Sequence, residues 1–291
     1  MHGKHQETAR VTARRPCARR WEAWACAGAA LLILGLVPLG ARPASAEQSV
    51  FGVAPITAEA DVQPGSAYTA SIQVRNEAVS ATTASAPAPL RIKVYAMDWT
   101  MALDGTPRFV PAGTLPGSCS KWLEVNPAEF DLPPGQTQEV RYTLTVPADA
   151  RGTYHTVLMF EPGGQPVKVR GGGMTVIGRM GSILYATAGP HRKSGRIIGF
   201  SATAAGMSLT LENSGDDHLR LLGGVTVKDG TGKVVRDEKL PGAVVLPHRD
   251  NRRQLGLNWS APLPAGDYTV TAVIDYGGEE LLGAETHIRA P

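Results

Sequence analysis

Apolar and polar residues alternate along most of this chain, and this two-residue period constrains the fold more than any other feature. In the run VRYTLTV at 140–146, both valines, the tyrosine and the leucine fall on one face, while the arginine and the threonines fall on the other. Such a period is that of a β-strand with one buried face. After residue 47, no segment keeps an apolar period of 3.6 residues over three turns. The sequence therefore predicts an all-β fold.

Similar runs recur along the chain, separated by clusters of Gly, Pro, Asn and Asp, which are typical of turns. The strands expected in the first half lie at 68–74, 90–95, 140–146, 153–160 and 174–185. Those expected in the second half lie at 197–203, 207–212, 221–228, 233–237, 254–259, 268–276 and 279–288. Asp229-Gly230-Thr231-Gly232 is expected to form a hairpin turn. Strands that follow one another without helices favour antiparallel sandwiches.

A polar stretch bounded by Gly and Pro at 189–195 separates the two groups of strands and is the predicted linker. In each half, one tyrosine, Tyr154 or Tyr268, follows a Gly-containing turn and precedes an apolar strand. A tyrosine in this place can bond back to the preceding backbone, as in the tyrosine corner of immunoglobulin-like domains. We expect two tandem immunoglobulin-like β-sandwiches, at 47–190 and 196–291, with one large barrel as the alternative.

The first 46 residues differ from the rest in charge. The chain holds 29 Lys and Arg against 26 Asp and Glu, a formal net charge of +3. Seven of these bases and two of these acids lie in 1–46, so the remaining 22 bases and 24 acids give −2. An Arg-rich segment, an apolar stretch and Ala44-Ser45-Ala46 follow in the order of a secretory signal peptide. An uncleaved membrane anchor is the alternative. The rest of the chain has no basic surplus for nucleic acid, which is not an expected partner.

Catalytic patterns are missing from the sequence. It contains no G-x-S-x-G, H-E-x-x-H or phosphate-binding loop. Cys119 is the one cysteine beyond residue 46, so it is expected to be a bystander thiol without a disulfide. His155 is expected on a sheet face, and Asp216-Asp217-His218, which follows an Asn-Ser-Gly turn, on a surface loop. We expect no enzyme activity, metal, cofactor or small-molecule substrate.

The segment WLEVNPAEFDLPPGQTQEVR at 122–141 resembles the N-terminal domain of periplasmic pilus-assembly chaperones. It is similar to that family's x-P-x-x-F-x-L-x-P-G-x-x-Q-x-V-R run. The segments 146–149 and 154–162 are similar to the proline-bounded turn and the apolar strand that follow this run in the family. Ile72–Asn76 is similar to an early family strand that ends in Asn. The resemblance covers roughly residues 50–190.

The resemblance implies a periplasmic chaperone that lends a β-strand to pilin-like subunits lacking their last strand, and that works with an outer-membrane usher. The lending strand would lie within 167–185. Its apolar candidates are Met174, Val176, Ile177, Met180, Ile183 and Tyr185. The alternative is a non-catalytic structural or adhesive protein of the cell envelope with the same fold, because a fold does not determine a function.

Two positions depart from the family pattern. The family anchors the subunit's terminal carboxylate with an Arg on the first strand and a Lys on the last strand of the first domain. Here 49–60 contains neither Arg nor Lys, and Ser182 stands near the place of the Lys. Arg179, a few residues earlier, is the candidate for a single anchoring charge.

Overall fold

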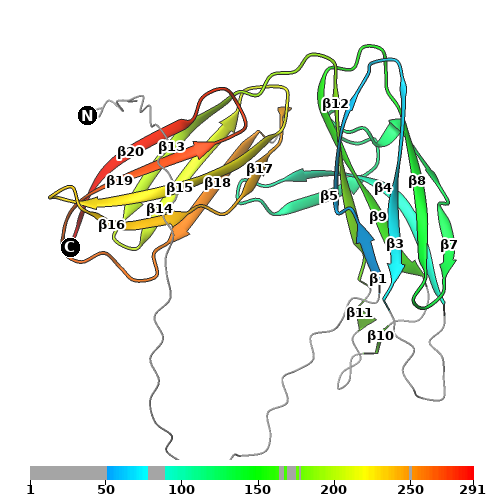
Figure 1. Cartoon of the computed structure of the whole chain (residues 1–291), viewed down its shortest axis with the longest axis horizontal. Helices are drawn as coiled ribbons and strands as arrows, with labels where there is room; N and C mark the ends of the chain where they lie inside the picture. The colour runs from blue at the N-terminus through cyan, green and yellow to red at the C-terminus, as the bar shows by residue number, and fades with distance from the viewer. Residues whose placement is uncertain (1–50, 78–88, 164–166, 169–174, 177, 249–250) are drawn as a thin grey trace, which may run out of the picture. The chain divides into compact units, whose positions relative to one another are not determined.

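The computed structural model describes residues 51–77, 89–163, 167–168, 175–176, 178–248 and 251–291. The predicted signal peptide lies outside them, as do Met174 and Ile177. The described residues form two β-sandwiches, the first blue to green and the second yellow to red in Figure 1. Their helical part is the short 3-10 turn η1 (Ser120–Trp122), and no helix within these ranges has the length and hydropathy to cross a membrane. The predicted fold class, two tandem immunoglobulin-like sandwiches, is confirmed.

The first sandwich has two layers. One sheet has the order β1 (Phe51–Ala54), β3 (Ala67–Asn76), β8 (Thr137–Thr145), β6 (Leu123–Asn126). The other has the order β2 (Thr57–Val62), β12 (Met180–Ala188), β9 (Gly152–Gly163), β4 (Leu90–Met101), β5 (Pro107–Pro111), and β7 (Glu129–Leu132) also pairs with β4. A separate short hairpin joins β10 (Val167–Lys168) to β11 (Thr175–Val176).

Alternating side chains fill the space between these layers, as the sequence predicts. In β8, Val140, Tyr142 and Leu144 are buried, whereas Arg141 is exposed. The largest fully buried side chains of this core are Ile72, Ile92, Leu132, Leu144, Leu158, Phe160 and Leu184. Each contributes roughly 1.5–3 kcal/mol by leaving water.

The chain changes layers between β1 and β2, at Pro55 and Ile56. The Ser182 hydroxyl donates a hydrogen bond to the Pro55 carbonyl at 2.7 Å, and the Ile183 N–H donates to the Ile56 carbonyl at 2.9 Å. From there β2 runs parallel to β12, with Thr57 opposite Ile183 and Val62 opposite Ala188. The bend at Pro55 and Ile56 therefore decides how much of the edge of β12 is covered by β2.

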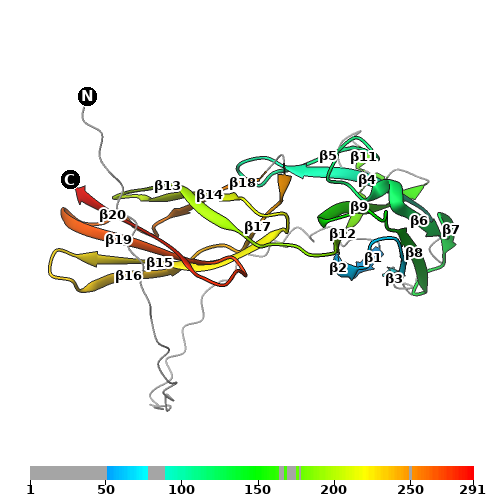
Figure 2. The same ribbon diagram turned by 90° about the horizontal axis from the view of Figure 1, so that it is seen from above.

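The second sandwich has a sheet of β13 (Gly195–Thr203), β14 (Gly206–Asn213) and β18 (Arg252–Asn258). Its other sheet has β16 (Val234–Lys239), β15 (Leu219–Asp229), β19 (Gly266–Asp275) and β20 (Leu282–Ala290) side by side, and β17 (Ala243–Val245) pairs with the start of β15 (Figure 2). The predicted hairpin turn between β15 and β16 is confirmed. The Asp229 carboxylate accepts hydrogen bonds from the Thr231 and Lys233 amides there, and Gly232 has a φ of 85°.

One strand expected from the sequence is interrupted. The run at 174–185 is divided between β11, which ends at Val176, and β12, which begins at Met180. Conversely, β5, β6, β7 and β17 were not expected, because strands of three to five residues are too short to show a period.

Candidate functional site

We call the side of β12 at Met180–Ser182 that faces away from β9 its open edge, because no described strand pairs with it there, although the Ser182 side chain itself is buried. On one side, β12 pairs with β9 along its whole length. On the other side, β2 covers it only from Ile183 onward. The Ile183 N–H donates to the Ile56 carbonyl, just before β2. Because backbone groups alternate in direction along a strand, the N–H and C=O of Gly181 point toward the same side of β12. No strand in the described ranges pairs with this edge at Met180–Ser182. Unpaired edge groups are a template for another strand.

The side chains of β12 alternate between two faces. Met180 and Leu184 pack into the core of the first sandwich. Ile183 and Tyr185 face the other way and pack with an apolar cluster formed by Trp99, Val157, Met159 and Leu246. The structure thus divides the predicted lending residues Met180, Ile183 and Tyr185 between opposite faces. Val176 belongs to the short strand β11.

Two exposed side chains flank the open edge. Ile56, at the bend between β1 and β2, is 66% exposed. Arg179, directly before β12, donates from Nη1 to the Tyr95 hydroxyl at 3.2 Å, and Tyr95 in turn donates to the Glu161 carboxylate. The bond to Tyr95 raises the pKa of the Arg179 guanidinium. Arg179 is therefore charged and accessible, but it already has a partner. Ile56 was not identified from the sequence, because exposure of an isolated apolar residue has no sequence signal.

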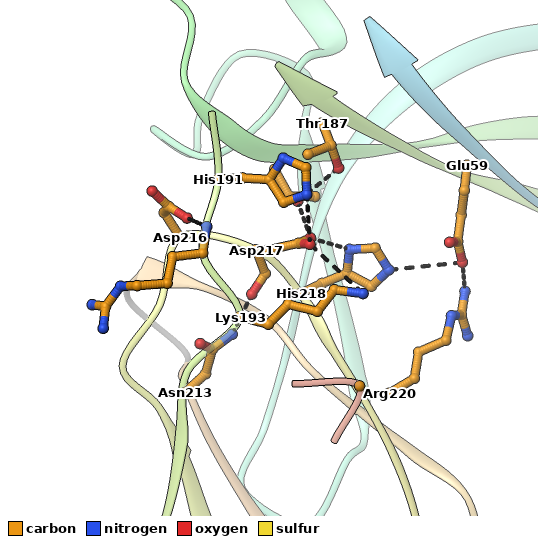
Figure 3. Close-up of polar contacts among 12 residues, drawn as sticks. Glu59, Thr187, His191, Lys193, Asn213, Asp216, Asp217, His218 and Arg220 are labelled. Carbon is orange, nitrogen blue, oxygen red and sulfur yellow. Dashed lines mark hydrogen bonds and ion pairs between the residues drawn. The ribbon is translucent and has the colours of Figure 1, made fainter. Parts of the chain in front are cut away.

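A polar cluster lies where the two sandwiches meet, and Figure 3 shows Asp217 at its centre. The Thr153 hydroxyl donates to Asp217 Oδ1 at 2.5 Å, and His218 Nδ1 lies 3.0 Å from the same oxygen. His191 Nε2 and Lys193 Nζ lie 3.6 and 3.8 Å from Oδ2. Burial acts to raise the pKa of Asp217, but hydrogen bonding by His218 and Thr153 outweighs it and lowers the pKa to about 2. Asp217 is thus an ionised carboxylate that ties the sandwiches together.

Residues 216–218 form a loop, as expected, but the expected surface position is wrong for Asp217 and His218, which are 3% and 5% exposed. Their burial comes from residues distant in sequence. Glu59 Oε1, on β2, lies 3.7 Å from His218 Nε2 and also pairs with the Arg220 guanidinium (Figure 3). The ring of Tyr185 stacks on His218 with centroids 4.4 Å apart. Tyr185, a predicted lending residue, therefore lies within this junction.

The remaining candidates have structural surroundings. Cys119 is fully buried, and burial raises its thiol pKa to about 12, so the thiol is protonated at neutral pH. Tyr154 packs its ring on Trp122 with centroids 4.4 Å apart. The Tyr268 hydroxyl donates to the Pro264 carbonyl at 3.0 Å, four residues upstream. His155 lies on the sheet face, as expected, and is 6% exposed.

No protein-family model matches this chain, and no curated protein matches its sequence. Solved structures do match it. The CfaA chaperone of class 5 fimbriae is 14% identical, with 83% of this chain and 99% of that chain covered and a TM-score of 0.43. The SafB chaperone in complex with the SafA pilin of Salmonella enterica is 14% identical, with 84% and 98% covered and a TM-score of 0.43.

The CsuC–CsuE pre-assembly complex of chaperone and tip adhesion subunit from Acinetobacter baumannii is 12% identical, with 84% and 100% covered and a TM-score of 0.44. These solved structures are fimbrial chaperones, the class of protein that residues 122–141 resemble in sequence.

Proposed function

We propose that this chain is a non-enzymatic periplasmic chaperone that binds pilin-like or fimbrial subunits by adding one of its strands to them, and that it acts together with an outer-membrane usher. The observation that carries the proposal is the open edge of β12 at Met180–Ser182. A subunit that lacks a strand needs backbone hydrogen bonds and apolar side chains from a partner. The open edge provides backbone groups for such hydrogen bonds. The resemblance over residues 122–141 also favours this function.

The lending segment lies upstream of Ile183 in this proposal. From Ile183 onward both edges of β12 are paired, and its side chains fill the core and the domain junction. A subunit strand would therefore pair with the backbone of Gly181 and continue toward residues 174–179. Met174, Val176 and Ile177 are the proposed apolar donors, and Ile56 lies beside the end of the added strand.

Amide hydrogen exchange tests this placement at two neighbouring residues. A tagged chain is co-expressed in the periplasm with a fimbrial subunit, and the free and bound forms are compared. The Gly181 amide should exchange rapidly in the free chain and at least tenfold more slowly in the complex. The Ile183 amide, which is bonded to Ile56 in the free chain, should be protected in both. A complex that leaves Gly181 exchange unchanged contradicts strand addition at this edge. Failure to recover any subunit favours the structural or adhesive alternative.

Arg179 provides a single anchoring charge in this proposal. Because its guanidinium is exposed, its pairing with a subunit carboxylate is screened by water and salt. Arg179→Gln should weaken subunit binding roughly two- to fivefold at low ionic strength and less in 0.5 M salt. The charge-preserving Arg179→Lys is the control and should lose less. Equal losses for both variants, or a loss that salt does not reduce, would argue against a role for the charge.

A further inference from the structure

Three buried ring nitrogens at the domain junction have no hydrogen-bond partner among the described residues. One of them, His218 Nδ1, lies 3.0 Å from Asp217 Oδ1, and the other two are Trp99 Nε1 and His155 Nδ1. The rings of these two residues are 5.2 Å apart, and Trp99 is 2% exposed. The other nitrogen of His155, Nε2, lies 3.0 Å from the Trp99 carbonyl. Buried polar atoms are nearly always bonded, so an exception requires an explanation.

The second sandwich covers the face of β9 that carries His155. Tyr154, Leu158 and Phe160 of this strand pack into the first core, whereas Val157 lies in the apolar cluster that includes Leu246 of the second sandwich. Thr153, two residues before His155, donates its N–H to the Asp216 carbonyl at 2.8 Å. His155 is therefore in a position to gain water when the sandwiches separate.

The groups that face His155 offer little support for a positive charge. Asp98, on β4, is the one nearby carboxylate among the described residues whose charge acts on it, and Asp98 already accepts bonds from Ser118, Ser120 and the Leu115 amide. His218 and His248, from the second sandwich, act against a charge there. Tyr185, from β12, and Cys119, from the adjacent loop, are neutral side chains.

We propose that His155 makes the junction an acid-sensitive latch, which holds the two sandwiches together at neutral pH and releases them as the imidazole is protonated. This latch does not depend on the chaperone function proposed above. The proposal gives a role to His155, a buried residue that belongs neither to the apolar core of the first sandwich nor to the open edge of β12.

The direction of the effect follows from proton linkage. Burial lowers the pKa of His155 to about 4, whereas a solvent-exposed imidazole titrates near ~6.5. Between these values the separated form binds more protons, so acidification favours separation by nearly tenfold per pH unit, up to about 300-fold. His218 also lies at the junction, between the carboxylates of Asp217 and Glu59. The experiment must therefore distinguish the two histidines.

Cleavage of the linker reports the separated population. Arg192 and Lys193 are tied into the junction, since the Arg192 N–H donates to Asp216 and Lys193 pairs with Asp217. Papain cleavage of the full chain at 189–194 is measured from pH 6.5 to 5 and normalised to a free peptide of the same sequence. The wild-type rate should rise about tenfold while far-ultraviolet circular dichroism stays constant. The His155→Gln rate should stay flat, whereas the His218→Gln rate should still rise as the pH falls.

A flat wild-type rate, or the same rise in His155→Gln as in the wild type, would overturn the proposal. If His155→Gln does not fold, the cleavage assay of that variant is replaced by a titration of the His155 ring in the wild-type chain, followed by nuclear magnetic resonance. A titration midpoint well below 6 is then expected. A midpoint at or above 6.5 would overturn the latch, because docking would not suppress protonation.

Discussion

Replacing Ile56 with Asp should weaken subunit binding by at least tenfold and leave the stability of the chain unchanged. Ile56 is 66% exposed in the free chain, so its replacement removes little packing. An added strand would cover it, and burial of this side chain is worth roughly 1.5–2 kcal/mol, which is a factor of ten or more in affinity. An aspartate would in addition have to lose its hydration.

The chain provides a matched control for Ile56 in Leu222. This residue is 65% exposed, but it lies on β15 of the second sandwich and belongs to neither strand of the open edge, β2 or β12. Leu222→Asp should bind subunits as the wild type does, and Ile56→Val should retain most of the affinity. Affinities are measured by titration calorimetry with a purified subunit, and unfolding in urea checks stability. Equal losses for Ile56→Asp and Leu222→Asp would contradict a specific role of Ile56.

Replacing Asp98 with Ala should lower the free energy of unfolding by about 3 kcal/mol, because it leaves several buried donors without an acceptor. Asp98 is fully buried on β4. Its carboxylate accepts bonds from the Ser118 hydroxyl at 2.5 Å, the Ser120 hydroxyl at 2.6 Å and the Leu115 amide at 2.7 Å. It thereby organises the loop that precedes η1. Sequence reasoning did not identify Asp98, because its partners are brought together only by the fold.

Acidification provides a second test of Asp98. Burial acts to raise its pKa, but the bonds from Ser118, Ser120 and Leu115 outweigh burial and hold the pKa below its usual value. The stability that Asp98 provides is therefore present above pH ~4 and is lost as pH falls below that value. Urea unfolding at pH 7 should show the full loss in Asp98→Ala, and the difference from wild type should shrink toward pH 3. Asp104→Ala, at an exposed turn, should change stability by less than about 0.5 kcal/mol. A loss below 1 kcal/mol in Asp98→Ala would contradict the assigned role.

The periodicity of the sequence predicts the long strands well, for a physical reason. β3, β8 and β19 each have one buried face and one exposed face, so their residues must alternate. The split of 174–185 between β11 and β12 could not be predicted in this way, because apolar residues on both sides of the glycines conceal the break. Both faces of β12 are covered, by the core and by the junction, which further weakens any two-residue period.

The junction was beyond sequence reasoning because its members are far apart in the chain. Asp217 meets Thr153, and His218 meets Glu59, across the boundary between two sandwiches. Taken alone, each residue is a polar side chain of a kind that is usually solvated on a loop or a strand. The open edge at Gly181 could not be predicted from the sequence either. It depends on the residue of β12 at which β2 begins to pair, and the bend at Ile56 determines that residue. The resemblance in sequence predicts a lending strand within 167–185, and the register of β2 is the reason why we propose its residues before Ile183.

The layer change at Pro55 and Ile56 places two different contacts on one short piece of chain. Ile56 borders the open edge, and Glu59, three residues later, faces His218 and Arg220 of the second sandwich. Roughly 10 Å of a single strand separates them. Thermodynamic reciprocity then applies to the pair: if a docked second sandwich improves capture of a subunit, capture must improve docking by the same factor. Subunit binding and docking of the second sandwich would then be coupled through β2 and the bend that precedes it.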